Sequence, residues 1–313
     1  MTVLVIGGTG FIGRRVVPLL VARGQGVVCM DINPGTADYG PLGDKVKVVK
    51  GDVTQFDDVM SATLESRATR VLNLSYQIGS DWPPHFATKL NVVGMDNCFE
   101  AARLCAVEHT VFASSLAVNG QQSHYGERPV TEADFRHGDY QYAVHKIFNE
   151  WQAKDYTDKF GMTITAVRPA NVTGYDKVRG SVDHVNCITQ PARGMSISFP
   201  FRDAMRCPIH VDDIAEVFVR VVLTDKPKHA VYNSGGTSIS LGTLADLVRE
   251  FLPTADIRFG KDAGGRDISG NHLIDNSRLV GEFGVQYAPF RQRVLQIINE
   301  VRQDEGKPPI ADR

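Results

Sequence analysis

The feature that most constrains the fold is a glycine turn between a first apolar segment and a first amphipathic one. The segment "TVLVIGG" at residues 2–8 is a run of β-branched and aliphatic residues ended by glycines, which is typical of a strand buried on both faces of a parallel sheet. The segment "TGFIGRRVVPLLVARG" at 9–24 follows with apolar residues at helical spacing and a final glycine. The chain is therefore predicted to begin with a strand, a glycine turn and a helix.

The turn itself, "GGTGFIG" at residues 7–13, suits the binding of a dinucleotide. Gly7 permits a tight turn, Gly10 lets the backbone approach a pyrophosphate, and Gly13 lets helix and strand pack closely. The helix N-terminus offers free N–H groups to the phosphates. The spacing is one residue wider than the usual dinucleotide fingerprint, and a glycine turn alone also serves geometry, so the surrounding segments decide the interpretation.

A second predicted strand indicates which dinucleotide is bound. The segment "GVVCMD" at 26–31 ends in Asp31, about twenty residues beyond the turn, where a carboxylate can accept hydrogen bonds from the adenosine ribose. This favours NAD, because a 2′-phosphate would be repelled by Asp31. Arg14 and Arg15 lie close to the turn and leave NADP open, and a loop-capping Asp31 is the structural alternative.

Strands and helices continue to alternate along the chain. Further strands are predicted at 45–53, 70–75 and 109–115, and helices at 56–66 and 86–106. Alternation of this kind implies a parallel sheet covered on both faces. The predicted fold class is α/β, a doubly wound parallel sheet of the Rossmann type with a smaller α/β substrate domain.

Composition limits the partners. The 313 residues are 42% hydrophobic and 22% charged, and 34 Lys+Arg against 36 Asp+Glu leave a net charge of -2, so neither nucleic acid nor a membrane surface is indicated. No apolar run approaches the roughly 20 residues of a membrane helix. The first strand follows Met1 without a basic region or cleavage site, so a cytoplasmic protein is expected. Five unpaired-looking cysteines lack zinc-site spacing, and no metal is predicted.

A tyrosine and a lysine in "YQYAVHK" at 140–146 indicate chemistry. Tyr142 and Lys146 are four residues apart and share one helix face, whereas Tyr140 faces elsewhere. A nearby ammonium favours the phenolate and makes the tyrosine a better proton acceptor. The strand "VFASS" ends in Ser114 and Ser115, at the sheet edge where ligands of such folds bind. A Tyr-x-x-x-Lys pair alone would indicate only a solvated helix face. The glycine turn and the strand-end serines that accompany it make it a candidate site.

These segments together resemble the extended short-chain dehydrogenase/reductases of the NAD-dependent epimerase/dehydratase group. The matching pieces cover most of the chain and are, in order, "GGTGFIG", "CMD", "GDV", "LNVVGMDN", "FASSLAVNG", "YAVHK", "RPANVTG" and "IHVDDIA". The resemblance implies that Tyr142 is the catalytic acid/base and that Lys146 lowers its pKa and binds the nicotinamide ribose. It also implies that Ser115 polarises the substrate oxygen, with Ser114 as its neighbour.

The resemblance also implies the binding residues. Asp52 and Val53 would contact the adenine, Asn91 would lie in the helix behind the active site, and Asn171 would face the substrate or cofactor. The expected cofactor-binding set is Gly7, Gly10, Phe11, Ile12, Gly13, Asp31, Asp52, Val53, Leu74, Tyr142 and Lys146. Similar enzymes dimerise through the long helices around Asn91 and Tyr142, which predicts a homodimer.

The chain departs from the family pattern at several positions. The familiar Tyr-Gly-x-Ser-Lys becomes "YAVHK" at 142–146, Asn119 replaces a usual tyrosine, and Tyr76 of "LSYQ" stands where small alanines are usual. Tyr76 is therefore expected to alter the pocket. None of these changes removes a catalytic group.

Two other groups could be catalytic, but a structural role is predicted for each. His145 points away from Tyr142 on the helix and has no ligand partners nearby in sequence. Asp212 and Asp213 precede an apolar helical run, where aspartate caps free N–H groups and suits the helix dipole.

The expected reaction is the NAD-dependent oxidation of a secondary alcohol, since the set supplies a hydride acceptor and a base. Leu116 and Ala117 stand where the family's dehydratases carry Asp and Glu, which argues against a sugar dehydratase. Arg206 and Arg266 stand where similar epimerases place phosphate-binding arginines, which favours a nucleotide-sugar epimerase with tightly held NAD. The alternative is that both arginines are surface residues.

The segment between Asn171 and Arg206 is short for one that must enclose a nucleotide base, which favours a smaller substrate. The preferred prediction is a dehydrogenase of a sugar, sugar acid or other small hydroxy compound, with Arg206 or Arg266 holding a carboxylate. A non-catalytic NAD-binding sensor or scaffold is the alternative from another class. The NAD-binding domain is predicted at 1–171 and about 207–225, and the substrate-binding domain at about 172–206 and 226–313.

Overall fold

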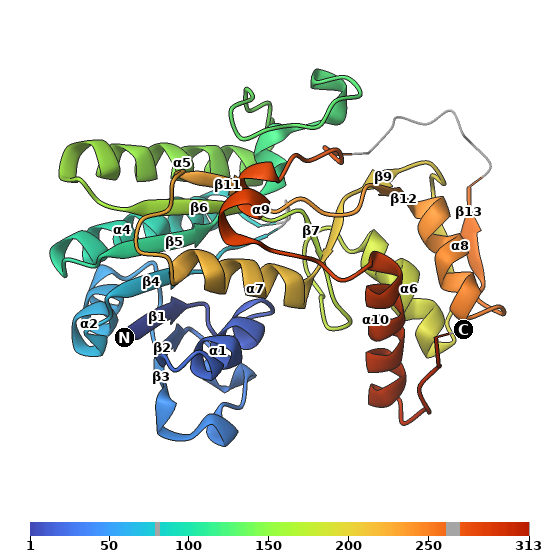
Figure 1. The fold of residues 1–313 in the computed structure, drawn as a ribbon, viewed down its shortest axis with the longest axis horizontal. Helices are drawn as coiled ribbons and strands as arrows, with labels where there is room; N and C mark the ends of the chain where they lie inside the picture. The colour runs from blue at the N-terminus through green and yellow to red at the C-terminus, as the bar shows by residue number, and fades with distance from the viewer. Residues whose placement is uncertain (79–81, 261–269, 313) are drawn as a thin grey trace.

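A single parallel sheet of seven strands organises the chain in a computed structural model that describes residues 1–78, 82–260 and 270–312 (Figure 1). Each neighbouring pair of strands is parallel. In spatial order the strands are β3 (Val46–Lys50), β2 (Gly26–Asp31), β1 (Thr2–Ile6), β4 (Arg70–Asn73), β5 (His109–Ala113), β6 (Ile164–Arg168) and β11 (Val231–Asn233). The predicted doubly wound fold class is confirmed.

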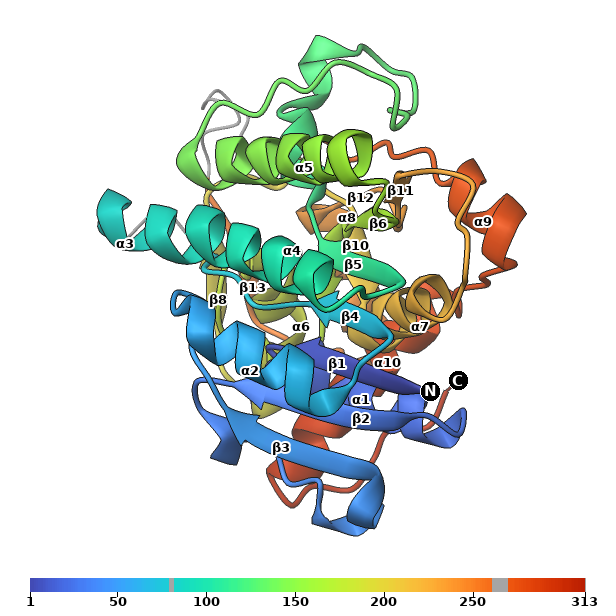
Figure 2. The ribbon, with the colours of Figure 1, turned by 90° about the vertical axis from the view of Figure 1, so that its left-hand side faces the viewer.

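Helices cover both faces of this sheet, because its central strands are apolar on both sides. Along β1, Val3 and Val5 pack into the cluster under α1 (Gly13–Ala22) and α7 (Val211–Val222). The alternating residues Leu4 and Ile6 pack into the cluster under the opposite helices. The helices on that face are α2 (Phe56–Ser66) and α4 (Gly94–Leu104), which contribute to this cluster, and α5 (Gln141–Phe160); Figure 2 shows the three side by side.

The strand order reverses at β1, whose neighbours are β2 on one side and β4 on the other. The chain leaves β1 toward β2 and leaves β4 toward β5, in opposite directions across the sheet, so the carboxyl ends of β1 and β4 form a topological switch point. Ligands of open α/β sheets bind at such a switch point. The glycine turn follows β1, and "LSYQ" follows β4, so both lie at this edge.

A second, smaller group of elements has an apolar core of its own. It consists of α6 (Asp183–Arg193), α8 (Leu241–Phe251), α10 (Phe290–Asp304) and the parallel pair β8 (Ile197–Phe199) and β13 (Ile257–Phe259). Figure 1 shows α6, α8 and α10 together beyond one end of the sheet. Two short pairs complete the strands, β7 (Asn171–Thr173) with β10 (Pro208–His210) and β9 (Met205–Arg206) with β12 (Ile239–Ser240).

Two elements differ from the sequence prediction. Strand β11 lies inside the span assigned to the substrate domain, yet it pairs with β6 in the main sheet. Three residues are too few to show a periodicity, so only the pairing reveals its place. The helix expected over 86–106 consists of α3 (Pro84–Thr88), a π-helical turn (Lys89–Val93) and α4.

The remaining short elements are α9 (Ser277–Phe283) and the 3₁₀ turns Pro34–Thr36, Gly40–Lys45, Leu116–Asn119 and Gln122–His124. Among the described residues, no helix is long and apolar enough to cross a membrane. All five cysteines are free, and all but Cys105 are buried.

Candidate active site

The glycine turn is fixed by contacts that admit no side chain at two of its positions. Gly7 has a φ of +75°, and a Cβ there would lie 2.8 Å from the backbone nitrogen of Ser75. A Cβ on Gly13 would lie 2.4 Å from the carbonyl oxygen of Gly8. These distances are shorter than real carbon contacts, so the tight turn and the close packing of helix on strand both require glycine.

Gly10 is in a different situation, since the nearest atom to a Cβ there would be the Gly7 oxygen at 3.1 Å. The residue therefore leaves room on its outer side, as the approach of a pyrophosphate requires. The buried hydroxyl of Tyr39 donates a 2.6 Å hydrogen bond to the carbonyl of Gly8 and braces the turn. The sequence contained no local signal for this contact, because Tyr39 lies 31 residues away.

Asp31 ends β2 beside the turn. Its Oδ2 accepts a 3.2 Å hydrogen bond from the N–H of Thr9, and its Oδ1 accepts a 3.0 Å hydrogen bond from the N–H of Asn33. Each carboxylate oxygen has a second lone pair. Asp31 thus closes the loop and still has acceptor capacity for a ribose, so the two readings of this residue are compatible.

The cations near the turn are already paired within the chain. Arg14 and Arg15 contact the carboxylate of Asp176 at 2.5 and 2.7 Å. Because both guanidinium groups are engaged, they are poorly placed to receive a 2′-phosphate, which favours NAD.

Other residues of the expected cofactor set lie along the same edge. Val53 is buried and Leu74 partly buried, and Leu74 continues the ladder of β4 through a 2.8 Å hydrogen bond to Ile6. Asp52 accepts a 2.8 Å hydrogen bond from the N–H of Thr54. The partly buried Phe11 and Ile12 pack on the core cluster under α1 and α7. The residues present fit a dinucleotide at this edge.

Ser115 and Tyr142 come together from β5 and α5. Ser115 follows β5, and its Oγ accepts a 3.1 Å hydrogen bond from the N–H of Ala117. Burial raises the pKa of the Tyr142 phenol, and the nearby Ser115 hydroxyl opposes this shift. The candidate base and the hydroxyl expected beside the substrate oxygen are therefore neighbours.

Lys146 lies one turn further along α5 and is 1% exposed. Its ammonium donates to the carbonyl oxygen of Ala113 at the end of β5 and lies 3.1 Å from the ring centroid of Tyr76. The Tyr142 ring centroid is 5.8 Å away. Burial lowers the pKa of Lys146 well below its usual range, and the charge of Glu150 opposes this shift.

Sequence reasoning missed a buried carboxylate behind the lysine. Glu150 accepts two 2.8 Å hydrogen bonds from Arg168, one of 2.9 Å from Arg136 and one of 2.6 Å from the hydroxyl of Ser114. Its place four residues after Lys146, on the same helix face, was the available signal. The network ties α5 to the ends of β5 and β6 and holds the lysine in place.

Asn91 occupies the π-helical turn behind the site. Its side chain bonds both backbone groups of Gln77, accepting from the N–H at 2.8 Å and donating to the carbonyl at 3.1 Å. Asn171, at the start of β7, accepts a 2.8 Å hydrogen bond from the N–H of Cys207. Both side chains therefore fix backbone, and contact of Asn171 with a ligand stays a prediction.

The two arginines expected near the substrate have different outcomes. Arg206 is 7% exposed and binds the carboxylate of Asp183 through Nε, at 3.0 Å, and through Nη2, at 2.5 Å. Its Nη1 donates to the carbonyl of Met205 at 2.7 Å. Arg266 lies outside the described residues.

His145 has a structural environment. Its Nε2 lies 3.4 Å from the hydroxyl of Thr88, and burial, with the charge of Lys146, lowers its pKa. No group of three or more possible metal ligands occurs among residues 1–78, 82–260 and 270–312.

The aspartates before α7 are structural as well, but they do not cap the helix as expected. The side chain that caps α7 is His210, whose Nδ1 accepts from the N–H of Asp212 at 3.2 Å. Asp213 instead pairs with Arg293 of α10, and Asp212 accepts a 2.9 Å hydrogen bond from Gln296. Partners from a distant helix have replaced the local cap, although both acidic groups remain in the first turn and suit the dipole.

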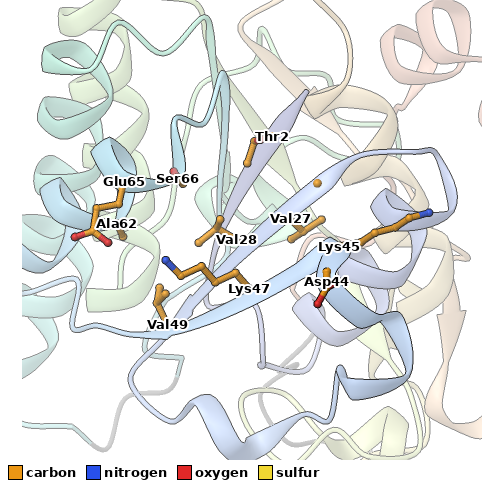
Figure 3. Close-up of a pocket in the computed structure, with 11 residues that line it drawn as sticks. Thr2, Val27, Val28, Asp44, Lys45, Lys47, Val49, Ala62, Glu65 and Ser66 are labelled. Atoms are coloured by element: carbon orange, nitrogen blue, oxygen red, sulfur yellow. The ribbon is translucent and has the colours of Figure 1, made fainter.

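A hollow of about 280 Å³ lies elsewhere, among the amino-terminal parts of β1, β2 and β3 and the end of α2 (Figure 3). Its lining includes Thr2, Lys47 and Glu65. None of the predicted catalytic residues reaches it, because they lie at the opposite, carboxyl edge of the sheet.

A glycine turn at the switch point of the sheet, next to a serine, a tyrosine and a buried lysine, is the arrangement of a nicotinamide-dependent oxidoreductase. Residues 3–235 match the model of the NAD dependent epimerase/dehydratase family, and the chain belongs to this family. The family resemblance seen in the sequence is confirmed, and the protein is an NAD-dependent enzyme of that family.

Individual relatives differ in activity. A UDP-glucose 4-epimerase of Mycolicibacterium smegmatis is 31% identical over 235 residues, which are 70% of this chain and 72% of the relative. The UDP-glucose 4-epimerase of Thermus thermophilus in complex with NAD has a TM-score of 0.84 at 24% identity, over 96% of this chain and 99% of that one. An L-threonine dehydrogenase of Cupriavidus necator has a TM-score of 0.82 at 19% identity, over 96% and 100%. At such identities the two structures show the fold alone.

Proposed function

We propose that the protein is a dehydrogenase that oxidises a secondary alcohol of a sugar, sugar acid or other small hydroxy compound. The observation that carries this proposal is that Ser115, Tyr142 and the buried Lys146 lie together at the carboxyl edge of the sheet. When bound there, NAD supplies the hydride acceptor. Ser115 would hold the alcohol oxygen while Tyr142 accepts its proton, and Lys146 would hold the nicotinamide ribose.

Arg206 supports a choice between substrate classes. A nucleotide sugar carries a diphosphate, for which a free guanidinium is the usual partner. Arg206 is buried and already bound to Asp183, so its charge is satisfied within the chain. With the short segment between Asn171 and Arg206, this supports a compact substrate.

A nucleotide-sugar 4-epimerase is the second candidate. The 31% identical relative from Mycolicibacterium smegmatis is a UDP-glucose 4-epimerase, and further epimerases occur among the relatives. For such a reaction the same Ser115, Tyr142 and Lys146 would serve, and the cofactor would return the hydride instead of leaving. The two candidates therefore differ in what happens to NAD after the first step.

The first experiment is to denature the freshly purified protein and measure the NAD(H) released per chain. The dehydrogenase proposal predicts protein that is largely empty and that binds added NAD reversibly. Turnover should then appear as NADH formation during a screen of sugars and hydroxy acids. Close to one retained NAD per chain would instead favour the epimerase, and nucleotide sugars would become the substrates to test.

The catalytic assignment is tested by Tyr142→Phe, which removes only the phenolic hydroxyl. Loss of a general acid/base predicts a fall in kcat of at least roughly 10²-fold. Tyr140→Phe is the matched control, because Tyr140 is exposed and the change keeps its ring stacked on Tyr142 while removing only a hydroxyl. Unchanged turnover in Tyr142→Phe would contradict the enzyme mechanism and favour a cofactor-binding sensor.

We also propose a cytoplasmic homodimer. The five free cysteines fit a reducing compartment. Val144, Phe148 and Trp151 form a stripe on α5 that is 48%, 48% and 54% exposed, beside Val93 at the start of α4. An apolar stripe on two adjacent helices supports a second copy of the chain as its partner.

A further inference from the structure

Tyr76 occupies an unusual position in the candidate site. It follows β4 at the switch point, where the family resemblance predicted a small residue. Its ring centroid lies 3.1 Å from Nζ of Lys146 and 5.5 Å from the ring centroid of Tyr142, with the two rings at 87°. The side chain thus touches both members of the predicted acid/base pair.

One side of the Tyr76 ring packs against the core. Tyr76 packs against a buried cluster that includes Met95, Phe99 and Phe112. The next residue, Gln77, has both backbone groups bound by the buried side chain of Asn91. The position of Tyr76 is therefore set by packing on one side and by hydrogen bonds along the chain.

Counting donors shows what the ring does for the ammonium. A lysine ammonium has three N–H groups. The carbonyl of Ala113 accepts one of them, and the face of the Tyr76 ring lies against the ammonium as a second, electron-rich surface. These contacts leave donor capacity on the Lys146 ammonium for a ligand.

We propose that Tyr76 is a positioning residue, whose ring forms a platform that holds the ammonium of Lys146 in place to bind the cofactor. The proposal rests on the assignment of the cofactor to this edge of the sheet. It assigns the ring, and not the hydroxyl, to this task, since the buried hydroxyl has no partner among the described residues.

The test is the dissociation constant of NADH, measured by fluorescence titration, which needs no substrate. Tyr76→Leu removes the aromatic face and keeps an apolar side chain, and the constant should rise roughly 3- to 30-fold, the range that a buried cation–π contact explains. Tyr76→Phe keeps the face and should restore binding to within about 2-fold of the wild type.

A matched control separates positioning from packing. Tyr156 packs on the same cluster and does not contact Lys146 in any described interaction. Tyr156→Leu should lower the melting temperature to an extent similar to Tyr76→Leu and leave the NADH dissociation constant within about 2-fold.

Four outcomes would overturn the proposal. Unchanged binding in Tyr76→Leu would show that the platform is dispensable, and tighter binding would show that the ring obstructs the cofactor. Equally weak binding in Tyr76→Phe and Tyr76→Leu would assign the effect to the hydroxyl. If the wild-type protein itself failed to bind NADH, the cofactor assignment would fall, and this proposal with it.

Discussion

At the scale of single residues, partner choice decides what a side chain can do. Arg206 has the residue type and sequence position of a phosphate-binding arginine, yet its guanidinium is bound to Asp183. The carboxylate of Asp183 is partly buried, and its hydrogen bonds to His184 and Arg206 outweigh the effect of burial and lower its pKa. This ion pair is therefore a structural element of the smaller unit.

The ion pair can be tested by Asp183→Asn. An arginine that is 7% exposed would lose its countercharge, and breaking a buried pair costs about 3 kcal/mol or more in the free energy of unfolding. Urea denaturation of the wild type and the variant measures this change. Asp246→Asn is the control, since the Arg202–Asp246 pair is about half exposed and should contribute less than about 1 kcal/mol. Equal effects of the two variants would contradict the assignment.

At the scale of elements, α5 serves two purposes on different faces. Tyr142, Lys146 and Glu150 recur every four residues and face the sheet. Val144, Phe148 and Trp151 recur at the same kind of spacing and face outward. Because both faces carry large side chains, the helix lacks the single apolar stripe of an ordinary surface helix. Figure 2 shows α5 beside α4 on the outside of the molecule.

This arrangement predicts a dimer that depends on the outer face of α5. Light scattering should give a mass about twice the 34.4 kDa of the chain. Replacing both Phe148 and Trp151 by Glu places charges in the contact and should raise the dimer dissociation constant by roughly 10²-fold or more. Phe135→Glu is the control, because Phe135 is 75% exposed on a segment outside these helices. A wild-type protein that stays monomeric would contradict the prediction.

At the scale of the whole molecule, buried histidines couple stability to pH. Burial lowers the pKa of His109 and of His184 to about 4, from an ordinary value of 6.5. The unfolded chain therefore binds more protons than the folded one between these values. Stability is fully present above pH 6.5 and is lost as the pH falls toward 4.

Urea denaturation at pH 7 and pH 4.5 should show this loss, to which His109 contributes roughly 2–3 kcal/mol. In the wild type the hydroxyl of Thr165 lies 2.9 Å from Nε2 of His109, and His109→Gln keeps a polar partner for it. The variant should show a smaller difference in stability between the two pH values. His85→Gln, at an exposed position, should leave the difference unchanged. A pH dependence that is the same in all three proteins would contradict this account.

Local rules explain which parts of the molecule were predictable. The glycine turn follows from steric limits at Gly7 and Gly13, and the facing of Tyr142 and Lys146 follows from the period of a helix. The parallel sheet follows from the alternation of apolar strands and helices. Each of these signals lies within a few residues, so a sequence pattern carries it.

Contacts between distant segments were not predictable in this way. His210 caps α7 while Asp213 pairs with Arg293 of a distant helix, and β11 joins the sheet through only three residues. Tyr76 was visible as a departure from the family pattern, but its ring against Lys146 joins positions 70 residues apart. The pattern marked the residue and not its contact.

The sequence by itself determined the fold class, the cofactor and the candidate Ser115, Tyr142 and Lys146, because short-range sterics and periodicity specify a strand, a turn and the faces of a helix. Only the tertiary structure decided that Asp183 neutralises Arg206 and that Tyr76 supports Lys146. Such pairings depend on how separately formed elements pack, and many side chains of suitable charge or shape compete for each partner.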